Sequence, residues 1–389
     1  MNNNIELVEL NKICNINSGG TPSRKKTSYF GGKIKWAKIS DLEKAGDGYI
    51  YDTDEKITAE GLNNIRNKIF ENGTLFLAMY GSVGKTAITK NEMSCNQAIL
   101  GITAKNENDL DLKFLKYWLD SKKKELLNSA KGVALKNLSA GMVKKLKIPL
   151  PPLSTQKRIA EILDNATALR DKTKQLLTEY DQLAQSIFLD MFGDPVTNPK
   201  GWKKNKTIDY CDCIVPGRDK PKSFTGDIPW VTTNDLNHLD FTEKSKLGKG
   251  LSAEEISQVK AKIIPENSII ITCVGDLGVV SINTKKMVVN QQLHTFQCSD
   301  KLNNVFLMFN LSFQKPYMYK MASSTTVPYM NKTIANGIPT IVPPIRLQNQ
   351  FAEKIALIEQ QKDLAKQELQ ESEDLFQALL QKAFKGGLN

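Results

Sequence analysis

The chain has 389 residues, of which 40% are hydrophobic and 24% are charged. This composition excludes a disordered chain, and the length predicts two or more domains of ordinary size. The formal net charge of +11 at pH 7 favours polyanionic partners, nucleic acid first among them, because neutralising phosphates releases counterions. Solubility alone is the alternative explanation of the charge.

Metal and membrane sites find little support in the sequence. The six cysteines are scattered, only Cys211 and Cys213 lie close together, and the chain has two histidines. A C-x-C pair without a second pair is a poor zinc signature, and free thiols are typical of a reducing cytosol. The first residues lack the basic and apolar regions of a secretory signal, and no apolar run approaches the roughly 20 residues of a membrane span. We therefore expect a soluble, cytoplasmic protein without a metal or a membrane segment.

The chain repeats itself with an offset of 194 residues. Residues 32–42, GKIKWAKISDL, correspond to residues 226–236, GDIPWVTTNDL. The same offset relates further pairs: Gly81 and Gly275, Gly84 and Gly278, Asn96 and Asn290, Gln97 and Gln291. Farther along, the offset becomes 192, so that residues 151–152 return as 343–344. A repeat this long is no solenoid unit, and it predicts two tandem domains related by an internal two-fold.

Each repeat begins with a mixed α/β head. Short runs rich in β-branched and aromatic residues predict strands at 34–39 and 74–79, and at 228–232 and 268–274 in the second repeat. Residues 112–121 and their counterparts 305–312 predict helices. Ser252 and Glu255 have the spacing of a capping box.

A proline-rich segment ends each head and precedes a long helix. Residues 148–153 and 341–345 cannot continue a strand or a helix, and the hydrophobic period then changes to that of a coiled coil over about 39 residues. Each helix has one narrow apolar stripe, its seam. The simplest partner of this seam is the seam of the other helix, and an internal two-fold would make the two helices antiparallel. Folding back on the head and pairing with another subunit are the alternatives. The predicted seam is Ile159, Leu163, Ala166, Leu177, Tyr180 and Ile187 with Phe351, Ile355, Ile358, Leu369, Phe376 and Leu379.

The predicted fold class is therefore α+β, with two tandem mixed α/β domains, each followed by a long helix. The two helices form an antiparallel coiled coil with pseudo-two-fold symmetry. The predicted boundaries are residues 1–150 for the first head, 151–193 for the central helix, 194–342 for the second head and 343–389 for the C-terminal helix.

Catalytic motifs are absent or incomplete. Residues 81–86, GSVGKT, end like a phosphate-binding loop, but Met79 stands where that loop needs glycine, and the duplicate 275–280 lacks the lysine. A tight turn with positive-φ glycines, either structural or approaching DNA, is the better interpretation. Neither histidine has an evident nucleophile partner, and no methyltransferase tetrapeptide is present. We expect no catalytic residue and no cofactor.

Polar and basic side chains at equivalent places in the two heads are candidates for DNA contact. Basic loops suit phosphates, whereas Asn, Gln, Asp, Lys and Arg can read base edges. Solvated loops, helix caps (Asp41 and Asp235) and buried amides (Asn96-Gln97) are the alternatives, and Trp36 and Trp230 are expected to be core anchors. The candidates are Thr21, Ser23, Arg24, Lys25, Lys26, Lys38, Ser40, Asp41, Ser82, Lys85, Asn96, Gln97 and Lys136 in the first head, and Arg218, Lys220, Lys222, Thr233, Asn234, Asp276, Asn290, Gln291, Gln292, Tyr329 and Asn331 in the second.

The order of these motifs resembles one protein family. Residues 151–159, PPLSTQKRI, and 343–351, PPIRLQNQF, together with the ends of both helices, the Ser18–Ser23 loop, the duplicated W-x-x-x-x-D-L and residues 81–85, resemble the specificity subunit of type I restriction-modification systems (HsdS). The second head departs at residues 215–219, Pro229 and Thr232, as two heads with different targets should.

The resemblance implies a non-catalytic subunit that binds double-stranded DNA. Each head would read one half of a bipartite target, and the coiled coil would set the spacer. The same helices would dock methyltransferase subunits, two copies being expected, and restriction subunits would join through them. The alternative is a coiled-coil adaptor that binds proteins without sequence-specific DNA binding.

Overall fold

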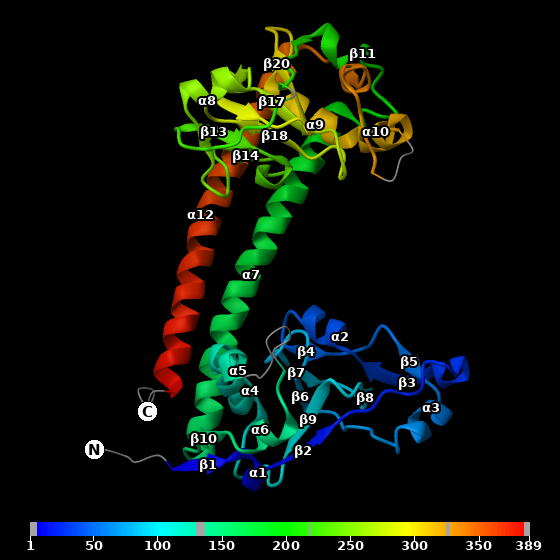
Figure 1. Ribbon diagram of the computed structural model, residues 1–389, viewed down its shortest axis with the longest axis vertical. Coiled ribbons are helices and arrows are strands. Elements are labelled where there is room, and N and C mark those ends of the chain that lie inside the picture. Colours follow the sequence, from blue (N-terminus) through cyan, green and yellow to red (C-terminus); the bar gives the residue numbers. More distant parts are fainter. Residues whose placement is uncertain (1–5, 130–136, 218, 324–326, 385–389) are drawn as a thin grey trace. The chain divides into compact units, whose positions relative to one another are not determined.

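The structure is a computed structural model that describes residues 6–129, 137–217, 219–323 and 327–384. The chain divides into two compact units, one formed by Met1–Gln175 with Lys366–Asn389 and the other by Leu176–Ala365. Each unit therefore combines a head with a segment of both long helices, α7 (Leu153–Phe192) and α12 (Ile345–Phe384), which are green and red in Figure 1.

A five-stranded sheet forms the centre of the first head. Its strands are antiparallel except for the last pair, and their order is β2 (Cys14–Ser18), β9 (Ile99–Ala104), β6 (Leu75–Ala78), β7 (Thr86–Thr89), β4 (Tyr49–Ile50). Side chains of β6 alternate between two cores: Leu75 and Leu77 pack with α4 (Leu112–Ser121), whereas Phe76 and Ala78 pack on the opposite face. A sheet covered on both faces explains why β6 and β7 are wholly buried.

The opposite face is covered by a second, smaller layer that carries the candidate residues Lys38, Ser40 and Asp41. Its strands follow the order β5 (Lys56–Ile57), β3 (Phe30–Ala37), β8 (Ser94–Cys95), with helices α2 (Ile39–Lys44) and α3 (Ala59–Asn64) beside them. Trp36 of β3 is 1% exposed, as expected of a core anchor.

The second head repeats this topology, with one additional strand, β16, in the smaller layer. Its large sheet has the order β12 (Cys211–Asp212), β20 (Leu293–Cys298), β17 (Ile269–Thr272), β18 (Val280–Asn283), β14 (Phe241–Thr242). The smaller layer is β15 (Gly250–Leu251), β13 (Ile228–Val231), β19 (Met287–Val289), β16 (Ile263–Ile264), with α8 (Ala253–Gln258) capped by Ser252 and Glu255. The duplication in the sequence is a duplication of fold, and the predicted capping box is confirmed.

Each head also contains a two-stranded sheet, whose last strand directly precedes the long helix, and several short helical elements. In the first head they are β1 (Leu7–Glu9) paired with β10 (Lys147–Pro149), with α1 (Leu10–Ile13), α5 (Lys123–Ser129), α6 (Ala140–Lys144) and the 3-10 turn η1 (Thr27–Tyr29). In the second they are β11 (Lys204–Lys206) paired with β21 (Pro339–Ile341), with α9 (Asn304–Phe313), α10 (Lys315–Met321), α11 (Lys332–Asn336), η2 (Thr207–Asp209) and η3 (Thr233–Asp235).

The Pro-Pro-x-x-x-Gln motif anchors each long helix to its own head. The Gln156 side chain is fully buried, donates to the carbonyls of Asp109 (2.9 Å) and Pro151 (2.8 Å) and accepts from Asp111 N (2.9 Å). Gln348 repeats this arrangement, because it donates to Lys301 O and Pro343 O and accepts from Asn303 N. A buried amide satisfied by three backbone groups fixes the direction in which the helix leaves the head.

The long helices pack against each other in each unit, and they run antiparallel. In the first unit Ile159, Leu163 and Ala166 share a core with Phe376, Leu380 and Ala383, and Lys174 forms an ion pair with Glu373 at 3.1 Å. In the second unit Phe188 contacts Phe351, whereas Asp181, earlier in α7, pairs with Lys362, later in α12, at 2.9 Å. The predicted packing of two long helices in an α+β protein with tandem heads is confirmed.

Burial along the helices differs from a uniform heptad seam. Of the predicted seam, Leu177, Tyr180, Ile187, Leu369 and Leu379 are only half-buried, whereas Phe188 and Phe192 are fully buried outside it. The rings of Phe306, Phe309 and Phe313 on α9 surround Phe188, so the C-terminal end of α7 buries a second face against the second head. The long helices also bury polar residues, Thr173 and Ser372 in the first unit and Lys362 in the second.

Candidate nucleic-acid interface

The Ser18–Ser23 loop of the first head is pinned to the turn between β8 and β9. Gly20 N donates to Cys95 O at 2.8 Å, and Trp36 Nε1 donates to Gly20 O at 2.9 Å. A Cβ on Gly19 would lie 2.2 Å from Cys95 O, so this close approach requires glycine. The contact brings Thr21 beside the exposed Gln97, and the Thr21 hydroxyl donates to the Gln97 side-chain oxygen.

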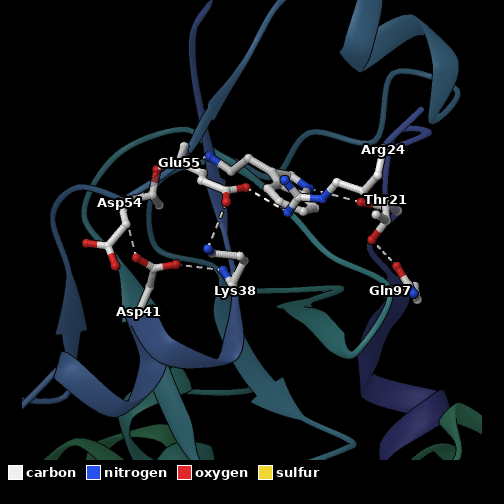
Figure 2. Close-up of polar contacts among 10 residues, drawn as sticks. Thr21, Arg24, Lys38, Asp41, Asp54, Glu55 and Gln97 are labelled. Carbon is white, nitrogen blue, oxygen red and sulfur yellow. Dashed lines mark hydrogen bonds and ion pairs between the residues drawn. The ribbon is translucent and has the colours of Figure 1, made fainter. Parts of the chain in front are cut away.

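Arg24 and Lys38 converge on one carboxylate, that of Glu55 (Figure 2). Arg24 Nη2 lies 2.8 Å from Glu55 Oε2, and Lys38 Nζ lies 3.0 Å from Glu55 Oε1. The hydrogen bond from Arg24 holds the pKa of Glu55 below its ordinary value. The Arg24 guanidinium also lies 4.4 Å from the centre of the Phe30 ring. These contacts fix two predicted DNA-binding cations in one place at the surface.

Asp41 caps α2, which was the alternative to base reading. Its Oδ2 accepts from Lys38 N at 2.7 Å and its Oδ1 from Asp54 N at 3.0 Å, and the residue is 5% exposed. Asp235 caps η3 in the same way, accepting from Thr232 N and Lys246 N at 2.7 Å each. Both carboxylates accept hydrogen bonds from backbone groups, so Asp41 orients the segment that carries Lys38.

The second head gathers six of the predicted residues around one cavity of about 520 Å³. Asn290 Oδ1 accepts from Gln292 N at 3.2 Å, which shapes the turn that presents the amides. Gln291 and Gln292 are exposed and Asn290 is half-buried, and the same holds for Gln97 and Asn96, so these pairs are not buried braces of the core. The six residues are Lys220, Thr233, Asn234, Asn290, Gln291 and Gln292.

The other predicted residues of the first head lie on the loop that carries Arg24, on α2, or on the turn that connects β6 and β7. Lys26 pairs with Glu60 at 2.9 Å, Ser23 and Lys25 are exposed, and Ser40 is half-buried on α2. Gly81 and Gly84 take positive φ, which confirms the predicted turn. On that turn Ser82 donates to the Glu43 carboxylate, and burial lowers the pKa of Lys85, which lines a separate cavity of about 620 Å³ with Lys116 and Lys123. Lys136 lies outside the described residues.

The remaining residues of the second head are more dispersed. Asp276 pairs with Lys315 at 2.7 Å, and Asn331 Oδ1 caps α11 by accepting from Ile334 N at 2.9 Å. Tyr329 is exposed, and its backbone forms isolated antiparallel β-bridges with Val274 and Ser323. Lys222 is exposed, and Arg218 lies outside the described residues.

Two charged residues that the sequence analysis did not name, Glu55 and Lys249, lie beside the predicted residues. The Lys249 ammonium lies 4.9 Å from the ring centre of Phe224 and lines the cavity of the second head. The two residues are 194 positions apart, so the internal repeat was the signal that could have identified them.

No catalytic centre is assembled in the described part of the chain. Cys213 Sγ lies 3.2 Å from His294 Nε2, which also lies 2.9 Å from Asn336 Oδ1, but burial raises the pKa of the Cys213 thiol and so disfavours a nucleophilic thiolate. The described part of the chain contains no cluster of three or more His, Cys, Asp or Glu residues that could hold a metal ion. None of the helices in these ranges combines the length and the hydropathy of a membrane span.

Burial of His294 predicts a pH dependence of stability. Burial lowers its pKa from 6.5 to about 4, so the unfolded chain takes up a proton before the folded chain does. The free energy of unfolding should therefore fall as the pH falls from about 6.5 towards 4. Urea unfolding of the wild type and of His294→Gln, whose amide still reaches polar partners, measures the difference. An equal pH slope in both proteins would contradict the prediction.

The two heads share one framework and differ in the side chains that the framework presents, which defines a two-headed protein with two chemically distinct surfaces. A family model, the type I restriction modification DNA specificity domain, matches residues 2–180 and again residues 199–373. The chain belongs to this family and contains its domain twice. The prediction of a restriction-modification specificity subunit that is not itself an enzyme is confirmed.

Individual relatives agree over most of the chain. The MjaIX specificity subunit of Methanocaldococcus jannaschii is 23% identical over 89% of this chain and 84% of its own length. The EcoBI specificity subunit of Escherichia coli is 22% identical over 81% of this chain and 73% of its own length. The S subunit of M. genitalium has the same fold, with a TM-score of 0.54 at 17% identity over 99% of this chain and 97% of that chain. A chain from a study of assembly and conformational transition in a type I R-M system gives a TM-score of 0.61 at 18% identity over 98% of both chains.

Proposed function

We propose that the chain reads a bipartite sequence in double-stranded DNA, with one half-site for each head. One observation carries the proposal: equivalent frameworks present different polar groups. Asp41 and Asp235 cap equivalent segments, and Trp36 and Trp230 occupy equivalent core positions, yet Lys38 is replaced by Thr232 and Ser40 by Asn234. Different donors and acceptors at the same place select different bases.

Basic side chains of the same loops would hold the phosphates. Arg24, Lys25 and Lys26 follow the pinned glycines in the first head, and Lys220 and Lys222 lie on the corresponding loop of the second. Cations on loops fixed to a rigid sheet position the duplex without reading its sequence. The net charge of +11 supports the same assignment.

The outer faces of the long helices would dock two methyltransferase subunits, and through them restriction subunits. Leucines remain exposed on both helices: Leu183 (47%), Leu357 (62%) and Leu364 (54%) in the second unit, and Leu169 (51%) and Leu375 (49%) in the first. Apolar side chains recurring on helix faces outside the antiparallel seam are typical of surfaces that another helix covers. In this assembly the helix pair would also set the spacer between the half-sites.

Salt titration of duplex binding tests the DNA proposal. The affinity of the chain in complex with its methyltransferase subunits should fall steeply with salt, and Lys25→Ala should reduce the slope of log K against log salt by about 0.9 for one lost phosphate contact. Lys12→Ala, an exposed lysine on α1 away from the basic loop, is the matched control. A protein-binding adaptor would show no steep loss of DNA affinity with salt.

A further inference from the structure

Glu55 and Lys249 occupy the same position in the two heads. Glu55 O accepts from Trp36 N at 3.2 Å, and Lys249 O accepts from Trp230 N at 3.0 Å. Beside each residue lies the same aromatic pair, Phe30 with Trp36 in the first head and Phe224 with Trp230 in the second. The backbone hydrogen bond and the aromatic pair establish the equivalence independently of the sequence offset.

The charge at this position is reversed, and its surroundings change with it. In the first head the Glu55 carboxylate forms ion pairs with both Arg24 and Lys38, so each of the three charged groups has a partner of opposite charge. In the second head Lys38 is replaced by Thr232, whose hydroxyl donates to Asp235 Oδ2 at 2.7 Å. Within the described residues, the Lys249 ammonium has ring contacts with Phe224 and Trp230 and no carboxylate partner.

Lys249 also lies among groups suited to the edges of bases. It lines the 520 Å³ cavity together with Thr233, Asn234, Asn290 and Gln291. Asp219 and Lys220, of opposite sign, line the same cavity. An ammonium donates three hydrogen bonds and accepts none, so it suits the O6 and N7 acceptors of guanine and is repelled by the amino groups of cytosine and adenine.

The geometry points to Lys249 as a specificity-determining residue that selects guanine at one position of the second half-site. Glu55 is the counterpart of Lys249 in the first head. Its carboxylate positions Arg24 and Lys38 and does not itself read a base. This inference rests on the proposed function, because it names the base that one head of the bipartite reader selects. The ring contacts hold the Lys249 side chain in place before DNA binds, which lowers the entropy lost on binding.

Substitutions at Lys249 separate base reading from folding. The full chain is assembled with its methyltransferase subunits, and methylated sites are mapped on a library of random duplexes. Lys249→Met retains the apolar stem and removes the donors, so the guanine preference at one position of the second half-site should fall by about tenfold to a hundredfold, with the first half-site unchanged. Lys249→Arg should retain guanine, and Lys249→Gln should shift that position towards adenine.

Lys286→Met provides the matched control, since Lys286 is exposed on the same head and does not line the cavity. Thermal unfolding of each assembled variant shows whether it folds. If Lys249→Met does not fold, the comparison of Lys249→Arg with Lys249→Gln tests the inference. A split motif in the wild type with unchanged base preferences in folded Lys249→Met and Lys249→Gln would overturn the inference and leave the proposed function intact. Absence of a split motif in the wild type would overturn both.

Discussion

Exchanging residues 194–342 for the corresponding head of a relative should replace one half of the recognised sequence and leave the other half unchanged. Each head has its own sheet and its own cores, and each long helix is anchored to its head by a buried glutamine, Gln156 or Gln348. The effect should be large, because each mismatched base pair in a half-site costs about 1–3 kcal/mol. Mapping of methylated sites before and after the exchange measures it.

The exchanged head must preserve its contact with the helices for this result to be interpretable. Phe306, Phe309 and Phe313 of α9 pack on Phe188 of α7 and should be kept as aromatic residues. The reciprocal exchange of residues 1–150 serves as the control and should alter the other half-site. Loss of both halves in either chimera that still assembles and methylates DNA would contradict independent reading.

Truncating Phe188 should cost about 3–5 kcal/mol in the free energy of unfolding, a large part of the roughly 5–15 kcal/mol typical of a domain. The side chain is fully buried and makes ring contacts with Phe192, Phe306, Phe309, Phe313 and Phe351, so Phe188→Ala would leave a cavity where α7, α9 and α12 meet. Chemical denaturation of the second unit, followed by Trp202 or Trp230 fluorescence, measures the loss.

The neighbouring residue provides the control. Leu189 is 40% exposed, and Leu189→Ala should change the free energy of unfolding of the isolated chain by less than 1 kcal/mol, the usual range for surface sites. Equal destabilisation by both substitutions would contradict a special contribution of the aromatic cluster, because alanine favours the helix at either position.

The internal repeat made the fold predictable. Two copies of one pattern indicated two heads, and the change of hydrophobic period after each proline pair indicated helices, which span 40 residues each at Leu153–Phe192 and Ile345–Phe384. Heptad periodicity did not identify Phe188, because its burial depends on α9, more than a hundred residues later in the chain. A helix that packs on two neighbours at once buries a wider face than a coiled-coil seam.

The candidate site was predicted in its composition but not in its pairing. Equivalent loops pointed to Arg24, Lys38 and the Asn-Gln pairs, but nothing local in the sequence linked Arg24 and Lys38 to Glu55, which lies 31 and 17 residues away. Asp41 could be a reader or a cap by its sequence, and only its two backbone donors, Lys38 N and Asp54 N, distinguish these roles. Side-chain pairing across a loop depends on tertiary placement, which local patterns do not contain.

The protected bases of a long duplex, mapped around the chain bound with its methyltransferase subunits, test two-headed reading most directly. We predict two short blocks of sequence-dependent contacts, separated by a gap of constant length in which any base is accepted. One continuous block of specific contacts, with no tolerant gap, would contradict it.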